Sequence, residues 1–292
     1  MSPIVAGVFA ALSFAVSVLV SARASRLVGA PVTVAGVMLV GFLIVLPVAA
    51  VTPLPAAAPG ALVVPVLAGA ATIVGLLLAY TGYTIGAVGV VSTIASTEGA
   101  IAALISVLAG QQLAPGSGPL LGLVAIGVIL AASGGGREIE EGVQIGRARS
   151  LRAAGLAAAA ALMFGSSLYL MGSTSGSLPI AWILLPGRAL GVVAVGVPLL
   201  LAGRARLTRV ALPYVVACGI VEITGLTAFS IGASVNIAVT AVLASMFAPI
   251  AAIAAFVLFG ERLARRQVAG IALVVAGIGL LGAAAGASRI AG

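Results

Sequence analysis

Long apolar runs alternate with short breaks along almost the whole chain. A helix needs about 20 residues to cross roughly 30 Å of hydrocarbon at about 1.5 Å per residue. Ten windows approach or reach that length, at 3–22, 31–51, 62–80, 86–109, 118–133, 152–172, 179–202, 210–229, 235–259 and 267–286. The breaks are rich in proline, glycine and arginine, which favour turns. Because open sheet edges cannot face lipid, the pattern predicts an all-α membrane protein with ten transmembrane helices.

The composition supports a lipid-embedded chain and excludes several kinds of chemistry. Of 292 residues, 62% are hydrophobic and 7% are charged, and the mean hydropathy is +1.34. This composition excludes a water-soluble domain. Lysine, aspartate and histidine are absent, and Cys218 is the single cysteine. We therefore expect no metal, no cofactor, no Ser-His-Asp triad and no nucleotide-driven pump, because each of these needs residue types that are missing.

The 14 basic residues are all arginines, and they are distributed unevenly. Twelve of them follow the first, fifth, seventh and ninth predicted segments, in turns such as those of Arg23, Arg149, Arg206 and Arg265, whereas Arg188 lies within the seventh segment and Arg289 follows the tenth. Arginine in short loops marks the cytoplasmic side. The pattern predicts a multi-pass protein of the plasma membrane with both termini outside. Nucleic-acid binding is not expected, because no basic arm is interleaved with aromatic residues.

The two halves of the chain carry weak internal similarity. Residues 100–113 align with 250–263, and 83–87 align with 229–233, at offsets of 146 to 150 residues. We predict two five-helix repeats, 1–134 and 151–287, joined by a cytoplasmic linker at 135–150. Since five is odd, the second repeat enters the membrane in the opposite orientation, which is the inverted-repeat plan of secondary transporters.

Several motifs resemble one transporter family. The Ala248-Pro249 pair, the Gly260–Leu263 run and the Phe164–Ser167 run resemble the EamA-like branch of the drug/metabolite transporter superfamily. The resemblance covers nearly the whole chain and implies a ten-helix bundle that moves small metabolites, often outward. The first half departs from the family pattern, with Gly99 in place of the usual proline and Gln111 in place of the glutamate.

Three ionisable side chains lie deep within predicted helices, namely Glu98, Arg188 and Glu222. A charge at the bilayer centre costs about 2.5–3.5 kcal/mol on insertion scales, so each should face a partner, water or a cavity. Glu98 and Glu222 are candidates for proton coupling or substrate contact, with a structural hydrogen bond as the alternative. Arg188 needs a carboxylate, backbone carbonyls or an anionic substrate group, unless it extends to the membrane surface.

Other polar side chains within the predicted helices are weaker candidates for substrate contact. They are Ser13, Ser17, Tyr80, Tyr83, Ser92, Ser96, Tyr169 and Asn236. Small residues at helical spacing also allow close helix packing, and a buried asparagine can bond to a neighbouring helix. Packing is therefore the alternative explanation for these residues.

These features predict a non-enzymatic secondary active transporter that works by alternating access. Its expected substrate is a small polar or amphipathic organic metabolite, amino-acid-like or drug-like, moved by efflux or exchange with proton coupling as an option. Its expected partners are the lipid bilayer, the substrate and protons, and the sequence predicts no oligomeric state. The alternatives are a membrane scaffold or assembly subunit and, less favoured, an intramembrane enzyme, for which metal-binding or nucleophilic residues are lacking.

Overall fold

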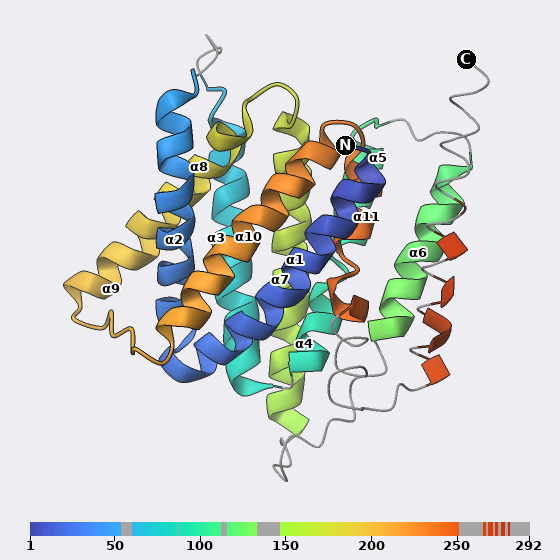
Figure 1. Ribbon diagram of the computed structural model, residues 1–292. Helices are drawn as coiled ribbons and strands as arrows, with labels where there is room; N and C mark the ends of the chain where they lie inside the picture. The colour runs from blue at the N-terminus through green and yellow to red at the C-terminus, as the bar shows by residue number, and fades with distance from the viewer. Residues whose placement is uncertain are drawn as a thin grey trace.

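The computed structural model describes residues 1–53, 60–86, 88–111, 116–132 and 147–250, with short stretches between 265 and 280. This described part is built from helices and contains no β-strand, as Figure 1 shows. The elements are α1 (Pro3–Val28), α2 (Ala30–Val51), α3 (Val63–Ile85), α4 (Val88–Ala95), α5 (Glu98–Leu108), α6 (Ser117–Ala132), α7 (Arg147–Thr174), α8 (Ile180–Gly191), a π-helical turn (Val192–Gly196), α9 (Val197–Leu201), α10 (Leu212–Ala233) and α11 (Ile237–Ala244).

Seven helical spans in the described residues are long and apolar enough to cross a membrane. They correspond to predicted segments one to four and six to eight, and the protein is a helical multi-pass membrane protein. Predicted segments 118–133 and 235–259 contain shorter apolar helices, at Gly118–Gly127 and Ile237–Ile250. Much of 267–286, and the boundary between the predicted repeats, lie outside the described residues. The count of ten helices therefore remains a prediction.

Helices that are distant in sequence pack side by side in the bundle. The most extensive packing is between α1 and α10 and between α3 and α7. Helix α2 packs on α8 and α10, α3 also packs on α8, and α5 packs on both α7 and α11. Helix α1 completes the arrangement by packing on α11 (Figure 1). The centre of the bundle is thus formed by helices from both halves of the sequence.

Glycines allow the closest of these crossings. Gly69 of α3 and Gly187 of α8 face each other so closely that a Cβ on either would collide with the other's backbone. A Cβ on Gly99 of α5 would lie 2.6 Å from the Oγ atom of Ser245, just beyond α11. Small residues at these positions let two backbones approach.

The fourth predicted segment is not one continuous helix. Helix α4 ends at Ala95, a turn covers Ser96 and Thr97, and α5 begins at Glu98. Helix α11 likewise ends at Ala244, before a turn at Ser245 and Met246. In each turn the serine donates a 2.7 Å hydrogen bond to the carbonyl three residues earlier, Ser96 to Thr93 and Ser245 to Val242. Such local bonds compete with the regular helical ladder.

Three boundaries differ from the sequence-based ones in ways that move candidate residues. Helix α1 continues to Val28 and the chain turns at Gly29, whose φ of +84° suits glycine. Arg26 therefore lies in the last helical turn, where a cation favours the exposed carbonyls. Helix α3 continues to Ile85, so Tyr83 is inside it. Asn236 precedes α11 and caps it, because its side-chain oxygen accepts a 2.9 Å hydrogen bond from the Val239 amide.

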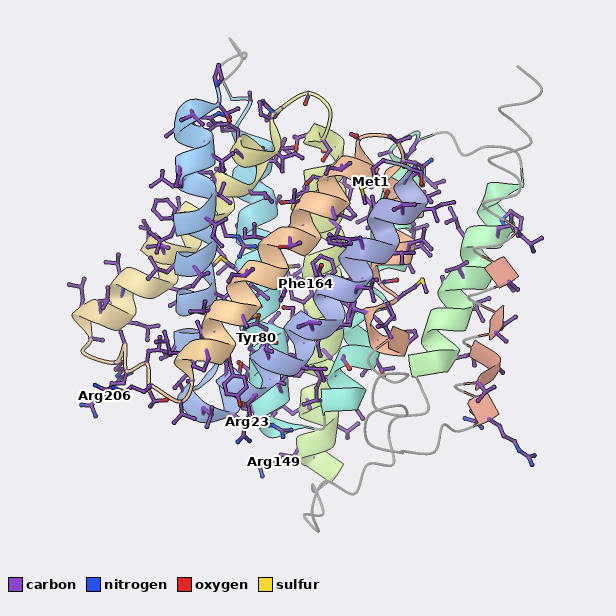
Figure 2. The ribbon with its side chains drawn as sticks, in the orientation of Figure 1. Met1, Arg23, Tyr80, Arg149, Phe164 and Arg206 are labelled. Atoms are coloured by element: carbon purple, nitrogen blue, oxygen red, sulfur yellow. The ribbon has the colours of Figure 1, made fainter. Side chains whose placement is uncertain are left out.

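Arginines gather at one end of the bundle. Figure 2 shows Arg23, Arg149 and Arg206 together at the end opposite Met1, with Tyr80 and Phe164 between the two ends. They come from α1, α7 and the loop before α10, so the folded chain brings separate arginine-rich turns to one side. The predicted segregation of these arginines is confirmed, and the assignment of that side to the cytoplasm remains a prediction.

Candidate functional site

A cavity of about 90 Å³ lies where helices from both halves of the chain meet. Its walls come from α1, α3, the α4–α5 break, α7, α10 and Phe247, which follows the turn after α11. The lining residues are Phe14, Ser17, Val18, Ser21, Thr72, Leu76, Ala79, Tyr80, Tyr83, Ala95, Glu98, Phe164, Ser167, Leu168, Glu222, Leu226 and Phe247. Figure 2 shows Tyr80 and Phe164 midway along the bundle, so the cavity lies deep between its two ends.

Glu98 places an ionisable side chain on the cavity wall. It is the first residue of α5, directly after the helix break, and it is 7% exposed. No group in the described part of the chain donates a hydrogen bond to its carboxyl. The close crossing of α7 contributes to its burial, because a Cβ on Gly165 would lie 2.8 Å from the Glu98 carbonyl oxygen. A buried carboxyl without a donor is costly unless a ligand or proton satisfies it.

Glu222 and Arg188 form a buried ion pair. The Nη2 atom of Arg188 donates to the Oε1 atom of Glu222 at 2.8 Å, and the two side chains are 3% and 7% exposed. The second guanidinium nitrogen, Nη1, lies 3.5 Å from the sulfur of Met38. Gly41 of α2 leaves room for the arginine, since a Cβ there would lie 2.9 Å from the Arg188 Cδ atom. The sequence left the partner of Arg188 open, and Glu222 is that partner.

The pair is placed asymmetrically with respect to the cavity. Glu222 lines the cavity of about 90 Å³, and its Oε2 atom is buried without a hydrogen-bond partner. Arg188 instead lines an adjoining cavity of about 20 Å³, which shares Thr72 and Leu226 with the larger one. Of the partners that the sequence left open for Arg188, the structure shows the carboxylate of Glu222, so in this structure the guanidinium is not free for an anionic substrate group.

The remaining polar groups on the wall bond mainly to one another. The sulfur of Cys218 lies 3.4 Å from both the Ser17 and the Tyr80 hydroxyls, which ties α10 to α1 and α3. The Thr72 and Ser167 hydroxyls are 2.6 Å apart, and Ser167 also donates to the Ala68 carbonyl at 2.8 Å. These bonds fix the wall. Among the lining side chains that the structure describes, the Glu98 carboxyl, the Oε2 atom of Glu222 and the Tyr83 hydroxyl make no hydrogen bond.

Aromatic side chains are concentrated at the cavity. The chain has 8 phenylalanines, 4 tyrosines and 1 tryptophan, and five of these side chains line it. They are Phe14, Tyr80, Tyr83, Phe164 and Phe247. The Tyr80 and Tyr83 rings are stacked, with centroids 6.1 Å apart. In a chain that is 4% aromatic, this clustering gives the cavity wall an unusual share of aromatic side chains.

Five of the sequence candidates line the larger cavity, namely Ser17, Tyr80, Tyr83, Glu98 and Glu222. Five others do not line either described cavity, namely Ser13, Ser92, Ser96, Tyr169 and Asn236. The reasons are local. The three serines donate to carbonyls within their own segments, Tyr169 packs in an apolar cluster, and Asn236 is a helix cap.

Sequence reasoning missed much of the apolar wall, including Phe14, Phe164 and Phe247. A usable signal was the helical spacing of Thr72, Leu76, Tyr80 and Tyr83, which places one polar-aromatic stripe along α3. Phe164 belongs to one of the family-like motifs, which did not place it at a cavity, and Phe14 and Phe247 carry no comparable signal because lipid-facing positions also accept aromatic residues.

Comparison with known proteins supports the fold without naming a family. No family model matches the chain, and no curated protein matches it. Among the solved structures, 15 chains match. One of them, described as "Crystal structure of protein", has a TM-score of 0.68 and 16% sequence identity, and the match covers 94% of each chain. At this identity the likeness shows a shared fold over nearly the whole chain and nothing about activity.

Proposed function

We propose that the protein is a secondary active transporter of a small organic metabolite, of the EamA-like kind within the drug/metabolite transporter superfamily. The observation that carries this proposal is the deep cavity between the two halves of the chain, with the unsatisfied carboxyl of Glu98 on its wall. In a protein with a purely structural role, this buried carboxyl would lower the stability and serve no function. A transporter uses such a group to hold its cargo or a proton.

The pattern of helix packing supports an inverted repeat. Each helix of the first half can be exchanged with its counterpart in the second half, namely α1 with α7, α2 with α8, α3 with α10 and α5 with α11. This exchange turns the α1–α10 contact into the α7–α3 contact, and both contacts are present. The same exchange converts α5–α7 into α11–α1 and α3–α8 into α10–α2, and leaves α2–α8 and α5–α11 unchanged. In Figure 1 helices α1 and α7 run in opposite directions. This is the behaviour expected of two five-helix repeats related by a two-fold axis in the membrane plane.

The two helix breaks support a moving cavity wall. Ser96-Thr97 and Ser245-Met246 interrupt corresponding segments of the two halves, and Gly99 packs against Ser245 where those segments cross. Discontinuous helices are tolerated within a membrane where they line a cavity, and transporters use them to form sites and to change access. We propose that the segments on either side of these breaks rock to expose the cavity alternately, in efflux or exchange with proton coupling.

A metabolite survey tests this function. Cells that produce the protein are compared with cells that produce the Glu98→Gln variant, using labelled metabolites in medium and cytosol. The control variant is Leu104→Ile, a lipid-facing change on the same helix, where Leu104 is 60% exposed. We expect the wild type and the control to shift the distribution of at least one small metabolite about tenfold relative to Glu98→Gln, since transport depends on the cavity carboxyl.

The outcome also separates the alternatives. A membrane scaffold would leave every metabolite distribution unchanged in all three strains while the protein is present at equal levels. An intramembrane enzyme would change the chemical identity of a metabolite rather than its distribution. Either result would contradict the proposed function.

A further inference from the structure

The charges around the cavity do not balance. Glu98 and Glu222 both line it, and the one cation in contact with either of them among the described residues is Arg188, which pairs with Glu222. Glu98 has no such partner, so the site carries one uncompensated acidic group when both carboxyls are ionised. The Oε2 atom of Glu222 adds a second acceptor without a donor. Such a wall attracts a cation and repels an anion.

The aromatic wall favours one class of cation. Five ring-bearing side chains surround the same space, including the stacked pair of Tyr80 and Tyr83. The face of an aromatic ring attracts a cation through its quadrupole, and cages of such rings recognise alkylammonium groups. A metal ion would instead need several oxygen ligands in a regular arrangement. Most polar wall groups here already bond to one another, which leaves too few oxygens for that arrangement.

The cavity volume sets the size of the occupant. An apolar cavity of roughly 150 Å³ accepts benzene, and the volume here is about 90 Å³. The space therefore suits a compact ligand, and an occupant of seven heavy atoms, one more than benzene, needs the wall to move outward as it binds. A diacyl lipid or a polyaromatic drug would not fit within it.

We propose that the cavity binds a small organic ammonium ion, with its charge against Glu98 and its alkyl groups against the aromatic rings. This assignment rests on the proposed transport function and specifies its substrate class. We do not propose an anionic substrate group at Arg188, one of the alternatives that the sequence left open, because Glu222 already pairs with that guanidinium. The cation binds the carboxylate form of Glu98, so cation and proton compete for one group. No covalent step is involved.

Three probes of nearly equal shape test the assignment with purified protein. They are choline, its uncharged carbon analogue 3,3-dimethylbutan-1-ol, and the anion 3,3-dimethylbutanoate. Binding is measured by calorimetry and by ligand-induced thermal stabilisation in a detergent that contains no choline lipid. We expect choline to bind at least about tenfold more tightly than the neutral analogue, because only choline has the charge that Glu98 and the rings attract. The anion should show no binding.

Variants identify the group responsible. Glu98→Gln should abolish the preference for choline over the neutral analogue, whereas Glu98→Asp should retain part of it. The lipid-facing Leu104→Ile variant should match the wild type in both affinity and preference. Equal binding of the charged and neutral probes by the wild type, or an unchanged preference in a folded Glu98→Gln variant, would overturn the assignment. Retained binding of the neutral analogue shows that the Gln variant is folded.

The same measurement separates a free cation from a lipid headgroup. Phosphatidylcholine added to the detergent should not compete with choline, because the cavity of about 90 Å³ has no space for the phosphate and glycerol groups. Competition by the lipid would overturn the assignment to a free cation.

Failure of this inference is distinguishable from failure of the proposed function. Transport of neutral or anionic metabolites in the survey, without choline binding, would uphold transport and refute the cation site. Choline binding that depends on Glu98, in a protein that moves no metabolite, would uphold the cation site and refute transport.

Discussion

Replacing Glu222 with leucine is expected to destabilise the protein by about 3–5 kcal/mol, which corresponds to a fall in the unfolding midpoint of roughly 10 °C. The change leaves the Arg188 guanidinium, whose side chain is 3% exposed, without its 2.8 Å partner. An arginine side chain stays protonated in proteins, so the free-energy cost of an unpaired buried charge is not relieved by loss of a proton. The midpoint is measured by following tryptophan fluorescence of Trp182 or scattering during heating in detergent.

A double-variant cycle shows whether the loss belongs to the pair. Arg188→Met should be less harmful than Glu222→Leu, because a carboxyl left alone can be neutralised by a proton. The double variant Arg188→Met/Glu222→Leu should recover to within about 1 kcal/mol of the wild type, since buried ion pairs replaced by apolar groups are often neutral in stability. Ile220→Val on the lipid-facing side of α10 is the control. Additive losses in the double variant would contradict a coupled pair.

The second large effect concerns pH. Because choline and a proton compete for Glu98, choline affinity in the wild type should rise by up to about tenfold per pH unit over the range in which Glu98 titrates. Glu98→Gln should make the affinity independent of pH within about twofold, because the amide does not titrate. Calorimetry in buffers of different ionisation enthalpy reports the protons released on binding, which should approach one in the wild type and zero in the variant.

Other ionisable groups near Glu98 need controls of their own. Tyr80 and Tyr83 from α3 and Glu222 from α10 line the same cavity, Cys218 from α10 touches Tyr80, and Arg188 holds Glu222. Tyr83→Phe removes one phenol and keeps its ring, so it should preserve the pH dependence. If Glu98→Gln keeps the wild-type pH dependence, another group in this set binds the proton and the competition model is wrong.

The sequence predicted the local elements of the fold well. Hydrophobic runs locate helices because each span needs a continuous apolar segment, whatever its neighbours are. The break at Ser96-Thr97 was not predicted, because the short polar run from Ser96 to Gly99 lies between two apolar stretches that together have the length of one membrane span. The sequence also predicts too early an end for the first helix, at residue 22, whereas α1 ends at Val28. The arginines at positions 23 and 26 favour a loop by their charge, but the helix continues through both of them.

The candidate site was predictable where charge made a residue conspicuous. Glu98, Arg188 and Glu222 stand out because ionisable side chains are rare in an apolar chain. Their relationship was not predictable, because the pairing of Arg188 with Glu222 rather than with Glu98 depends on how α8 and α10 cross. Phe14 and Phe164 could not be separated from lipid-facing residues by sequence alone. Whether a phenylalanine faces lipid or a cavity is decided by helix rotation.

The central claim is that one cavity opens to either face of the membrane, and cysteine accessibility tests it without knowledge of the substrate. Ser17 lines the cavity, and Cys218, the single and buried cysteine, can be replaced by alanine. A Ser17→Cys/Cys218→Ala protein is treated with the membrane-impermeant reagent trimethylammonium-ethyl methanethiosulfonate in right-side-out and in inside-out vesicles. The control is Ser177→Cys in the same background, at the exposed turn between α7 and α8.

Alternating access predicts that the cysteine at position 17 is labelled from both faces and that choline slows labelling from each. The cysteine at position 177 should be labelled from one face alone. Labelling at position 17 from a single face, or from neither face in a folded protein whose position 177 reacts, would contradict the account.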